Sequence, residues 1–169
     1  MVAGAQGRSL HNEQLVGTED PEMEQGGLEK GRRTSLTGAV IGACVEVHRH
    51  LGPGLLESAY ETCLVHELEL RGLEVERQTA IRLFYKGLAI DGGYRVDLVV
   101  ERQLIVEVKA IERLLPIHSA QLITYLRLSG LLDGLLINFN VPVLRAGIRR
   151  LYNASFPPFL PVKSPRDRE

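Results

Sequence analysis

Two short alternating segments, residues 94–100 and 104–110, constrain the fold of this chain more than any other part of its sequence. Strict alternation of apolar and polar residues is typical of β-strands, whose successive side chains point to opposite faces. A one-residue slip in their pairing would turn one apolar set away from a shared core, so we expect Val100 to pair with Leu104 across a three-residue connection. The two apolar sets are Tyr94, Val96, Leu98 and Val100, and Leu104, Val106, Val108 and Ala110.

The same register predicts a charged cluster on the other face, with Asp97 opposite Glu107 and Arg95 opposite Lys109. Carboxylates that face each other directly repel, and a divalent cation would relieve that repulsion. Mg²⁺ prefers oxygen ligands from one or two carboxylates together with water and phosphate, and Lys109 would place an ammonium beside it. An exposed ladder of carboxylates and ammonium groups would have the same spacing, so spacing alone leaves both interpretations open.

The remaining pattern predicts an α/β sandwich, with a central mixed β-sheet flanked by helices in the order ααβββαββ. One helix is expected from Thr34 or Ser35 to Leu51, where Gly52-Pro53-Gly54 ends it, and a second has its apolar face from Leu56 to Leu68. The other expected elements are strands over 75–85, 88–100 (loosened by a bulge at Gly92-Gly93), 104–110, 134–139 and 148–152, a turn at Lys86-Gly87, and a helix over 119–128.

The length of 169 residues suits one domain, which we place at residues 34–153. Residues 1–33 are rich in Gly, Glu and Gln and lack a sustained apolar period, which predicts a disordered N-terminal extension. Residues 154–169 contain four prolines and are expected to form a Pro-rich tail with one packed segment around 156–160.

Charge and hydropathy exclude two classes of protein. The net charge of −1 argues against a protein that coats nucleic acid with a broad basic surface, although a local site remains compatible with it. No stretch approaches the ~20 apolar residues needed to cross a bilayer, and the first residues lack a basic segment followed by an apolar run. We therefore expect a cytoplasmic protein without a membrane partner.

Three motifs together resemble a known nuclease superfamily. Asp97, then Glu107-Val108-Lys109, then a helix with Gln121 and Tyr125 resemble the PD-(D/E)xK nucleases, especially the branch with a Gln-x-x-x-Tyr helix that includes RecB-type exonuclease domains. The segment Gly54-Leu-Leu-Glu-Ser-Ala-Tyr60 is similar to the signature of the small GxxExxY protein family. The resemblance extends from about residue 36 to residue 153, and it departs from the older motif at Val96, where that motif has proline.

The resemblance implies metal-dependent hydrolysis of phosphodiester bonds in nucleic acid, with DNA as the first expectation and RNA left open. It implies Mg²⁺ or Mn²⁺ as the cofactor. Asp97 and Glu107 match the acidic metal ligands, Glu57 matches an acidic residue that the first part of the fold contributes, and the backbone carbonyl of Val108 is a further expected ligand. Without the resemblance, Glu57 would be read as a solvent-facing helix residue.

The resemblance also assigns catalytic roles outside the metal ligands. Lys109 matches the lysine that positions or activates the attacking water, and Gln121 and Tyr125 match residues that lean toward the phosphate and the lysine. Taken alone, Gln121 could cap a buried backbone group and Tyr125 could be a core aromatic. Two other functions stay open: a catalytically silent nuclease-like domain that binds nucleic acid or a protein, and a structural subunit of a complex.

Overall fold

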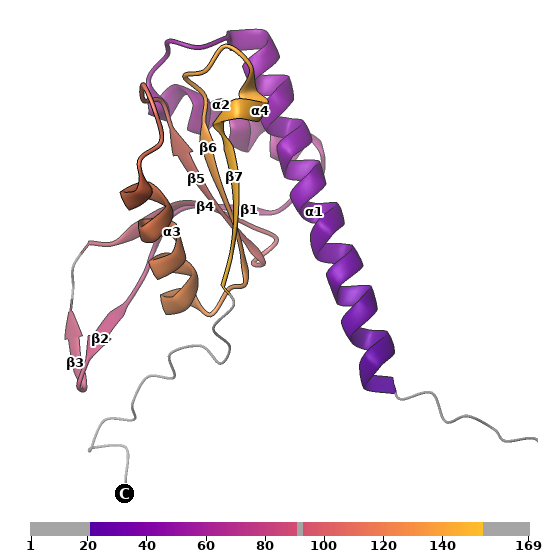
Figure 1. Cartoon of the computed structure of the whole chain (residues 1–169), viewed down its shortest axis with the longest axis vertical. Helices are drawn as coiled ribbons and strands as arrows, with labels where there is room; N and C mark the ends of the chain where they lie inside the picture. The colour runs from indigo at the N-terminus through magenta and orange to yellow at the C-terminus, as the bar shows by residue number, and fades with distance from the viewer. Residues whose placement is uncertain (1–20, 91–92, 154–169) are drawn as a thin grey trace, which may run out of the picture.

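The fold is a five-stranded mixed sheet with helices on both faces, as the computed structural model of the chain in Figure 1 shows. The structure describes residues 21–90 and 93–153, with side chains from residue 31 onward. This architecture confirms the predicted α/β sandwich. The elements are α1 (Pro21–Leu51), α2 (Glu57–Leu70), β1 (Val75–Ala80), β2 (Leu83–Tyr85), β3 (Leu88–Ile90), β4 (Arg95–Val100), β5 (Leu104–Lys109), α3 (Pro116–Ser129), β6 (Asp133–Asn138), α4 (Leu144–Gly147) and β7 (Ile148–Tyr152).

The sheet has the strand order β1-β4-β5-β6-β7, and β5 and β6 form its parallel pair. Each of the two long strands expected over residues 75–100 is divided into two, and β2 and β3 form a separate two-stranded ribbon. The predicted turn at Lys86-Gly87 is confirmed. Both residues have positive φ angles (47° and 86°), which a two-residue turn between antiparallel strands requires. The bulge predicted at Gly92-Gly93 falls partly outside the described residues, which omit 91–92.

Pairing between β4 and β5 has the register that the shared apolar core predicts. Val100 pairs with Leu104, and the ladder ends two residues further on, at Leu98 and Val106. The pairs predicted beyond this point, Asp97 with Glu107 and Arg95 with Lys109, are therefore wrong as backbone pairs.

Two apolar clusters cover the two faces of the sheet. On one face α1 and α2 pack against Leu98, Val106 and their neighbours, and on the other face α3 packs against Val99 and Ile105. Val96 belongs to the α3 cluster and not to the predicted set with Leu98. Tyr94 before β4 and Leu56 before α2 were also predicted to face the core, but both are exposed.

Helix α1 begins at Pro21, so the predicted start near Thr34 and the predicted disorder of residues 21–33 both differ from the structure. Residues 22–33 are rich in Glu, Gln, Lys and Arg, which favour helix without needing an apolar stripe. Figure 1 shows this part of α1 projecting beyond the sheet. None of the helices in the described ranges, 21–90 and 93–153, is long and apolar enough to cross a membrane.

Candidate active site

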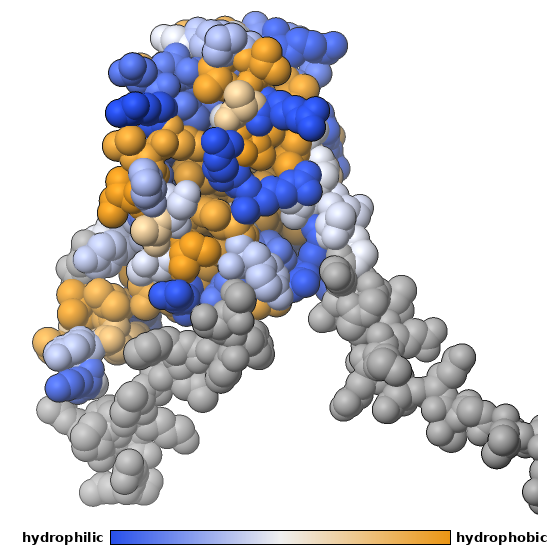
Figure 2. Space-filling view, in the orientation of Figure 1, coloured by the Kyte–Doolittle hydropathy of each residue, from blue (hydrophilic) through white to orange (hydrophobic). Residues whose placement is uncertain are grey.

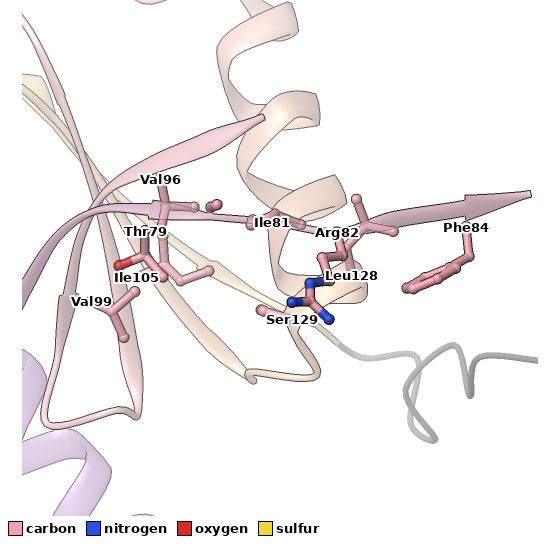
Figure 3. A pocket seen from close by; sticks show the side chains of 10 residues that line it. Thr79, Ile81, Arg82, Phe84, Val96, Val99, Ile105, Leu128 and Ser129 are labelled. Atoms are coloured by element: carbon pink, nitrogen blue, oxygen red, sulfur yellow. The ribbon is translucent and has the colours of Figure 1, made fainter. Parts of the chain in front are cut away.

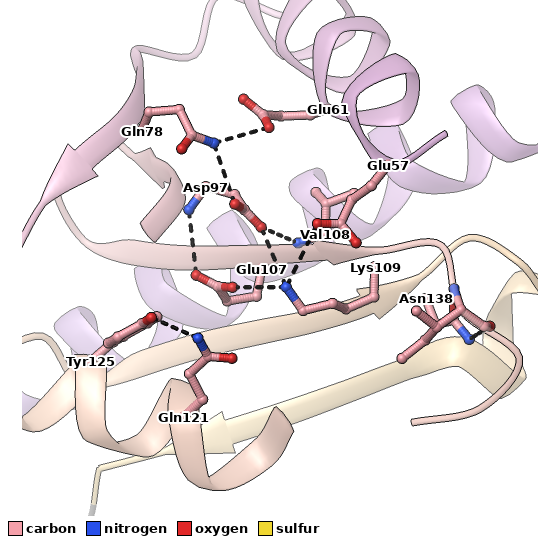
Figure 4. A network of polar contacts seen from close by, with 11 residues as sticks. Glu57, Glu61, Gln78, Asp97, Glu107, Val108, Lys109, Gln121, Tyr125 and Asn138 are labelled. Atoms are coloured by element: carbon pink, nitrogen blue, oxygen red, sulfur yellow. Dashed lines mark hydrogen bonds and ion pairs between the residues drawn. The ribbon is translucent and has the colours of Figure 1, made fainter. Parts of the chain in front are cut away.

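The candidate site lies where β4 and β5 separate at one end of the sheet (Figure 4). Beyond Leu98 the backbone ladder is replaced by side chains: the Asp97 carboxylate accepts a hydrogen bond from the Val108 N–H (2.9 Å), and the Asp97 N–H donates to the Glu107 carboxylate (3.4 Å). The two carboxylates thus lie in the gap between the strands. The sequence predicted that they approach each other but not this exchange of backbone for side-chain bonds.

The backbone of β5 directs one carbonyl into the same gap. The Lys109 carbonyl accepts a hydrogen bond from the Phe139 N–H (2.8 Å), on the β6 side. Because backbone groups of successive strand residues point to opposite sides, the N–H and C=O of Val108 point toward β4, as its bond to Asp97 requires. With the ladder ended, the Val108 carbonyl faces the carboxylates instead of a partner strand.

Lys109 lies among three carboxylates. Its Nζ atom is 3.3 Å from Glu107, 3.9 Å from Asp97 and 3.9 Å from Glu57 of α2. Burial lowers the pKa of Lys109, but the attraction of Glu107, Asp97 and Glu57 outweighs burial and holds that pKa above its usual value. The ammonium therefore stays charged over the whole neutral range.

Glu107 is buried, with 3% of its surface exposed. Burial, followed by repulsion from Asp97, raises the pKa of Glu107 to about 7 against the attraction of Lys109. The alternative of a solvated charge ladder does not describe these residues, because a ladder on the solvent side of a sheet would leave both carboxylates in water. Here the two carboxylates and the lysine are held in a largely enclosed space.

A supporting network behind Asp97 was not anticipated from the sequence. Gln78 donates hydrogen bonds to Asp97 (3.3 Å) and to the buried Glu61 of α2 (3.1 Å), and Arg77 also donates to Glu61 (3.1 Å). Gln78 has a φ angle of 48°, a left-handed conformation uncommon for a residue with a side chain. The one available signal was the placement of Glu61 four residues after Glu57, on the same face of the helix.

Gln121 and Tyr125 come from α3, on the other side of the sheet from α2. The Gln121 amide donates a hydrogen bond to the Tyr125 hydroxyl (2.7 Å), and Figure 4 shows both side chains beside the strand that carries Glu107. In the described part of the chain, no hydrogen bond or ion pair joins either residue to Asp97, Glu107 or Lys109. Their predicted contact with the lysine is thus not formed, although they flank the site.

Asn138 fixes the end of β5 and was also missed. It is buried opposite Lys109 in the β5–β6 ladder, and its side chain accepts from the Ile111 N–H (3.1 Å) and donates to the Ile111 carbonyl (2.8 Å). These two bonds anchor the chain directly after Lys109. Asn138 therefore restrains the backbone that carries the lysine.

The donor set fits a hard divalent cation. Within the ranges that the structure describes, no three His, Cys, Asp or Glu side chains are placed so that they could bind a metal ion without further ligands. Asp97 and Glu107 nevertheless offer two carboxylates and Val108 a carbonyl, which is the kind of partial shell that Mg²⁺ completes with water and phosphate. Three carboxylates against the one ammonium of Lys109 leave the site with excess negative charge, which a cation would balance.

Comparison with protein families identifies the superfamily of this chain. A model of the PD-(D/E)XK nuclease superfamily matches residues 34–151. The chain belongs to this superfamily. PD-(D/E)XK nucleases generally use divalent metals such as Mg²⁺. Comparison with curated proteins gives no match, and comparison with solved structures gives none either. The finer GxxExxY assignment stays a prediction.

Proposed function

We propose that this PD-(D/E)XK protein is a metal-dependent nuclease that hydrolyses phosphodiester bonds, with DNA as the first candidate substrate and RNA as the second. One observation carries the proposal: Asp97, Glu107 and Lys109 converge in a largely enclosed gap at the end of the sheet. A domain that only binds nucleic acid has no need to enclose two repelling carboxylates, whose burial costs free energy.

Asp97, Glu107 and the Val108 carbonyl would hold Mg²⁺ or Mn²⁺ at this position. The bound ion would lower the pKa of a water molecule and neutralise charge that develops on the phosphate. Gln78 holds Asp97 from behind, so the carboxylate is oriented before any ligand arrives. Preorganised groups of this kind cost little reorganisation during the reaction.

The role of Lys109 follows from its charge state. Since Glu107, Asp97 and Glu57 hold its pKa above the usual value, Lys109 enters the site as a charged hydrogen-bond donor. Its ammonium would orient the attacking water or bind the phosphate oxygens in the transition state. Glu57 restrains this ammonium from α2, and Gln121 and Tyr125 would contact the substrate backbone from α3. We also propose that Gly54–Tyr60 places the chain among the GxxExxY proteins.

Replacing Lys109 by Met tests this function directly. Met keeps the length of the side chain and removes its charge, so we expect cleavage to fall by at least about 100-fold while Mg²⁺ or Mn²⁺ still binds. The measurement is cleavage of labelled single-stranded and duplex DNA and RNA by the full chain, with each ion or with EDTA. Arg102→Met, at the exposed β4–β5 connection, is the matched control for loss of a positive charge.

Each outcome of this assay is informative. Cleavage by Lys109→Met at the wild-type rate would remove Lys109 from the mechanism. Oligonucleotide binding without cleavage under any ion would replace the nuclease by the catalytically silent binding domain that the sequence left open.

A further inference from the structure

The ribbon formed by β2 and β3 carries apolar side chains into solvent. Its cross-strand pairs Leu83 with Ile90 and Tyr85 with Leu88 share one face, and Phe84 with Ala89 occupies the other. Tyr85 is 60% exposed and Leu88 64% exposed. Figure 1 shows the ribbon extending from the sheet beside α3, and Figure 2 shows its hydrophobic surface at the edge of the molecule. Such exposure on an extended arm suggests a binding surface.

A hollow of about 260 Å³ lies between the base of this ribbon and α3. Leu83 and Tyr94 line one wall, and Ile117, Gln121, Thr124 and Tyr125 of α3 line the other. Gln121 and Tyr125 also flank Glu107 and Lys109, so the hollow and the candidate site share a wall (Figure 4). We call the hollow together with the Tyr85 face of the ribbon the ribbon groove.

The other side of the ribbon also places an aromatic side chain near a basic one. A second hollow, of about 240 Å³, lies between β1, β4 and the end of α3, and its lining includes Phe84 and Arg82 (Figure 3). Each side of the ribbon thus presents an aromatic side chain next to a basic one, since Lys86 lies 5.5 Å from the centre of the Tyr85 ring.

The segments around the ribbon groove are basic, although no Lys or Arg lines the hollow itself and the chain as a whole is not basic. Residues 78–96 and 113–132 carry five Lys or Arg and one acidic residue, whereas the whole chain has 20 Lys or Arg against 21 Asp or Glu. The basic residues are Arg82, Lys86, Arg95, Arg113 and Arg127, and all five are exposed. This local excess of positive charge suits a polyanion that approaches the site along the groove.

We infer that the ribbon groove binds a single-stranded nucleic acid and guides it to Asp97, Glu107 and Lys109. Unpaired bases have free faces that stack on exposed aromatic rings, here Tyr85 and Tyr94, while the basic residues contact the phosphates. In a duplex these faces are covered by neighbouring bases. The inference rests on the proposed nuclease function and narrows its substrate to single strands.

A second copy of this chain is the competing occupant of the ribbon groove. Two copies joined through this face would bring their basic residues together, and like charges at an interface oppose association. A polyanion is attracted by the same residues. Charge therefore favours nucleic acid, and the oligomeric state of the protein becomes part of the test.

Binding and cleavage are measured separately to test this inference. Fluorescence anisotropy of the full chain in EDTA, at fixed ionic strength, gives Kd for a labelled 12-nucleotide single-stranded DNA and for a hairpin duplex. We expect the single strand to bind at least about tenfold more tightly, and Tyr94→Leu and Tyr85→Leu each to weaken it about tenfold. Tyr94→Phe, which keeps the ring, should bind like the wild type. Tyr152→Leu, at a comparably exposed tyrosine in β7, is the control.

Three results would overturn the inference: equal Kd values for single strand and duplex, unchanged binding in both Leu variants, or a concentration-dependent dimer that Tyr85→Leu abolishes without any change in Kd. Cleavage with Mg²⁺ distinguishes the two proposals. If binding depends on the groove residues but no ion supports cleavage, the proposed nuclease function is contradicted and the proposed groove is supported. If the protein cleaves duplex DNA and the Leu variants cleave it equally well, the proposed groove is contradicted and the proposed nuclease function is supported.

Discussion

At the scale of single residues, Glu107 combines deep burial with a nearby negative charge. Its pKa of about 7 in the folded chain exceeds the ordinary value of 4.5, so the folded state binds more protons than the unfolded state between these pH values. The contribution of Glu107 to stability is therefore full below about pH 4.5. It is lost as the pH rises through about 7.

Replacing Glu107 by Gln should remove this pH dependence. In EDTA at pH 8 we expect Glu107→Gln to be more stable than the wild type, by no more than about 3 kcal/mol, and the difference should shrink at pH 5. Thermal unfolding at the two pH values measures this, and Glu76→Gln on the half-exposed β1 edge is the control. A variant that is less stable than the wild type at pH 8 would show that the bonds of Glu107 to Lys109 and Asp97 outweigh its repulsion.

Addition of metal should make the wild type more stable than Glu107→Gln. If Asp97 and Glu107 hold the ion, 100 Kd of Mg²⁺ or Mn²⁺ raises the stability of the wild type by about 2.7 kcal/mol through mass action. Asp97→Asn and Glu107→Gln should lose most of this gain. Equal shifts of Tm in the wild type and both variants would place the ion elsewhere.

At the scale of elements, the sequence predicted the pairing of β4 with β5 but not the point where it stops. Burial of Leu98, Val100, Leu104 and Val106 on one side fixed the register. The separation of the strands depends on the Asp97 carboxylate, which replaces a backbone partner for the Val108 N–H, and on the left-handed conformation of Gln78. Alternation of side chains carries no information about either, so Gln78 was missed.

The same limit applies to the long strands and to the first helix. Alternation continues through residues 81–82, where the chain leaves the sheet to form the ribbon, so the sequence indicated unbroken strands. Residues 21–33 lack an apolar stripe because that part of α1 projects beyond the sheet. Motif spacing, in contrast, identified Glu57, Asp97, Glu107 and Lys109, which the structure brings together.

The contact between α4 and the end of β6 supports the site from outside. A Cβ atom on Gly147 would collide with the Asn138 carbonyl oxygen, so Gly147→Ala must displace the backbone. We expect a loss of about 1–3 kcal/mol in the free energy of unfolding, measured with urea, and lower cleavage because Asn138 anchors the chain after Lys109. Gly38→Ala, in α1 with open space around it, should be neutral or stabilising by up to about 1 kcal/mol. A neutral Gly147→Ala would contradict this account.

At the scale of the whole molecule, α1 packs along one face of the sheet, and Arg33 attaches it to the end of the sheet opposite the candidate site. Arg33 forms an ion pair with Asp133 (3.4 Å) at the start of β6, and its guanidinium carbon lies 5.8 Å from the centre of the Tyr152 ring. The two paired atoms, Arg33 Nε and Asp133 Oδ2, are inaccessible to solvent and have no hydrogen-bond partner among the residues that the structure describes. This attachment lies within the segment that the sequence predicted to be a disordered extension.

Truncation at two positions tests the attachment. Removing residues 1–30 keeps Arg33 and should leave the free energy of unfolding within about 0.5 kcal/mol of the full chain, because the removed part of α1 projects beyond the sheet. Removing residues 1–33 also removes the ion pair with Asp133 and the contact of Arg33 with the Tyr152 ring, and should cost about 1–2 kcal/mol. Asp133→Ala in the shorter chain should recover part of that loss, since the unpaired charge is then absent. Urea unfolding of the full chain and the three variants measures these differences, and equal stability of the two truncated chains would show that the Arg33–Asp133 pair contributes nothing.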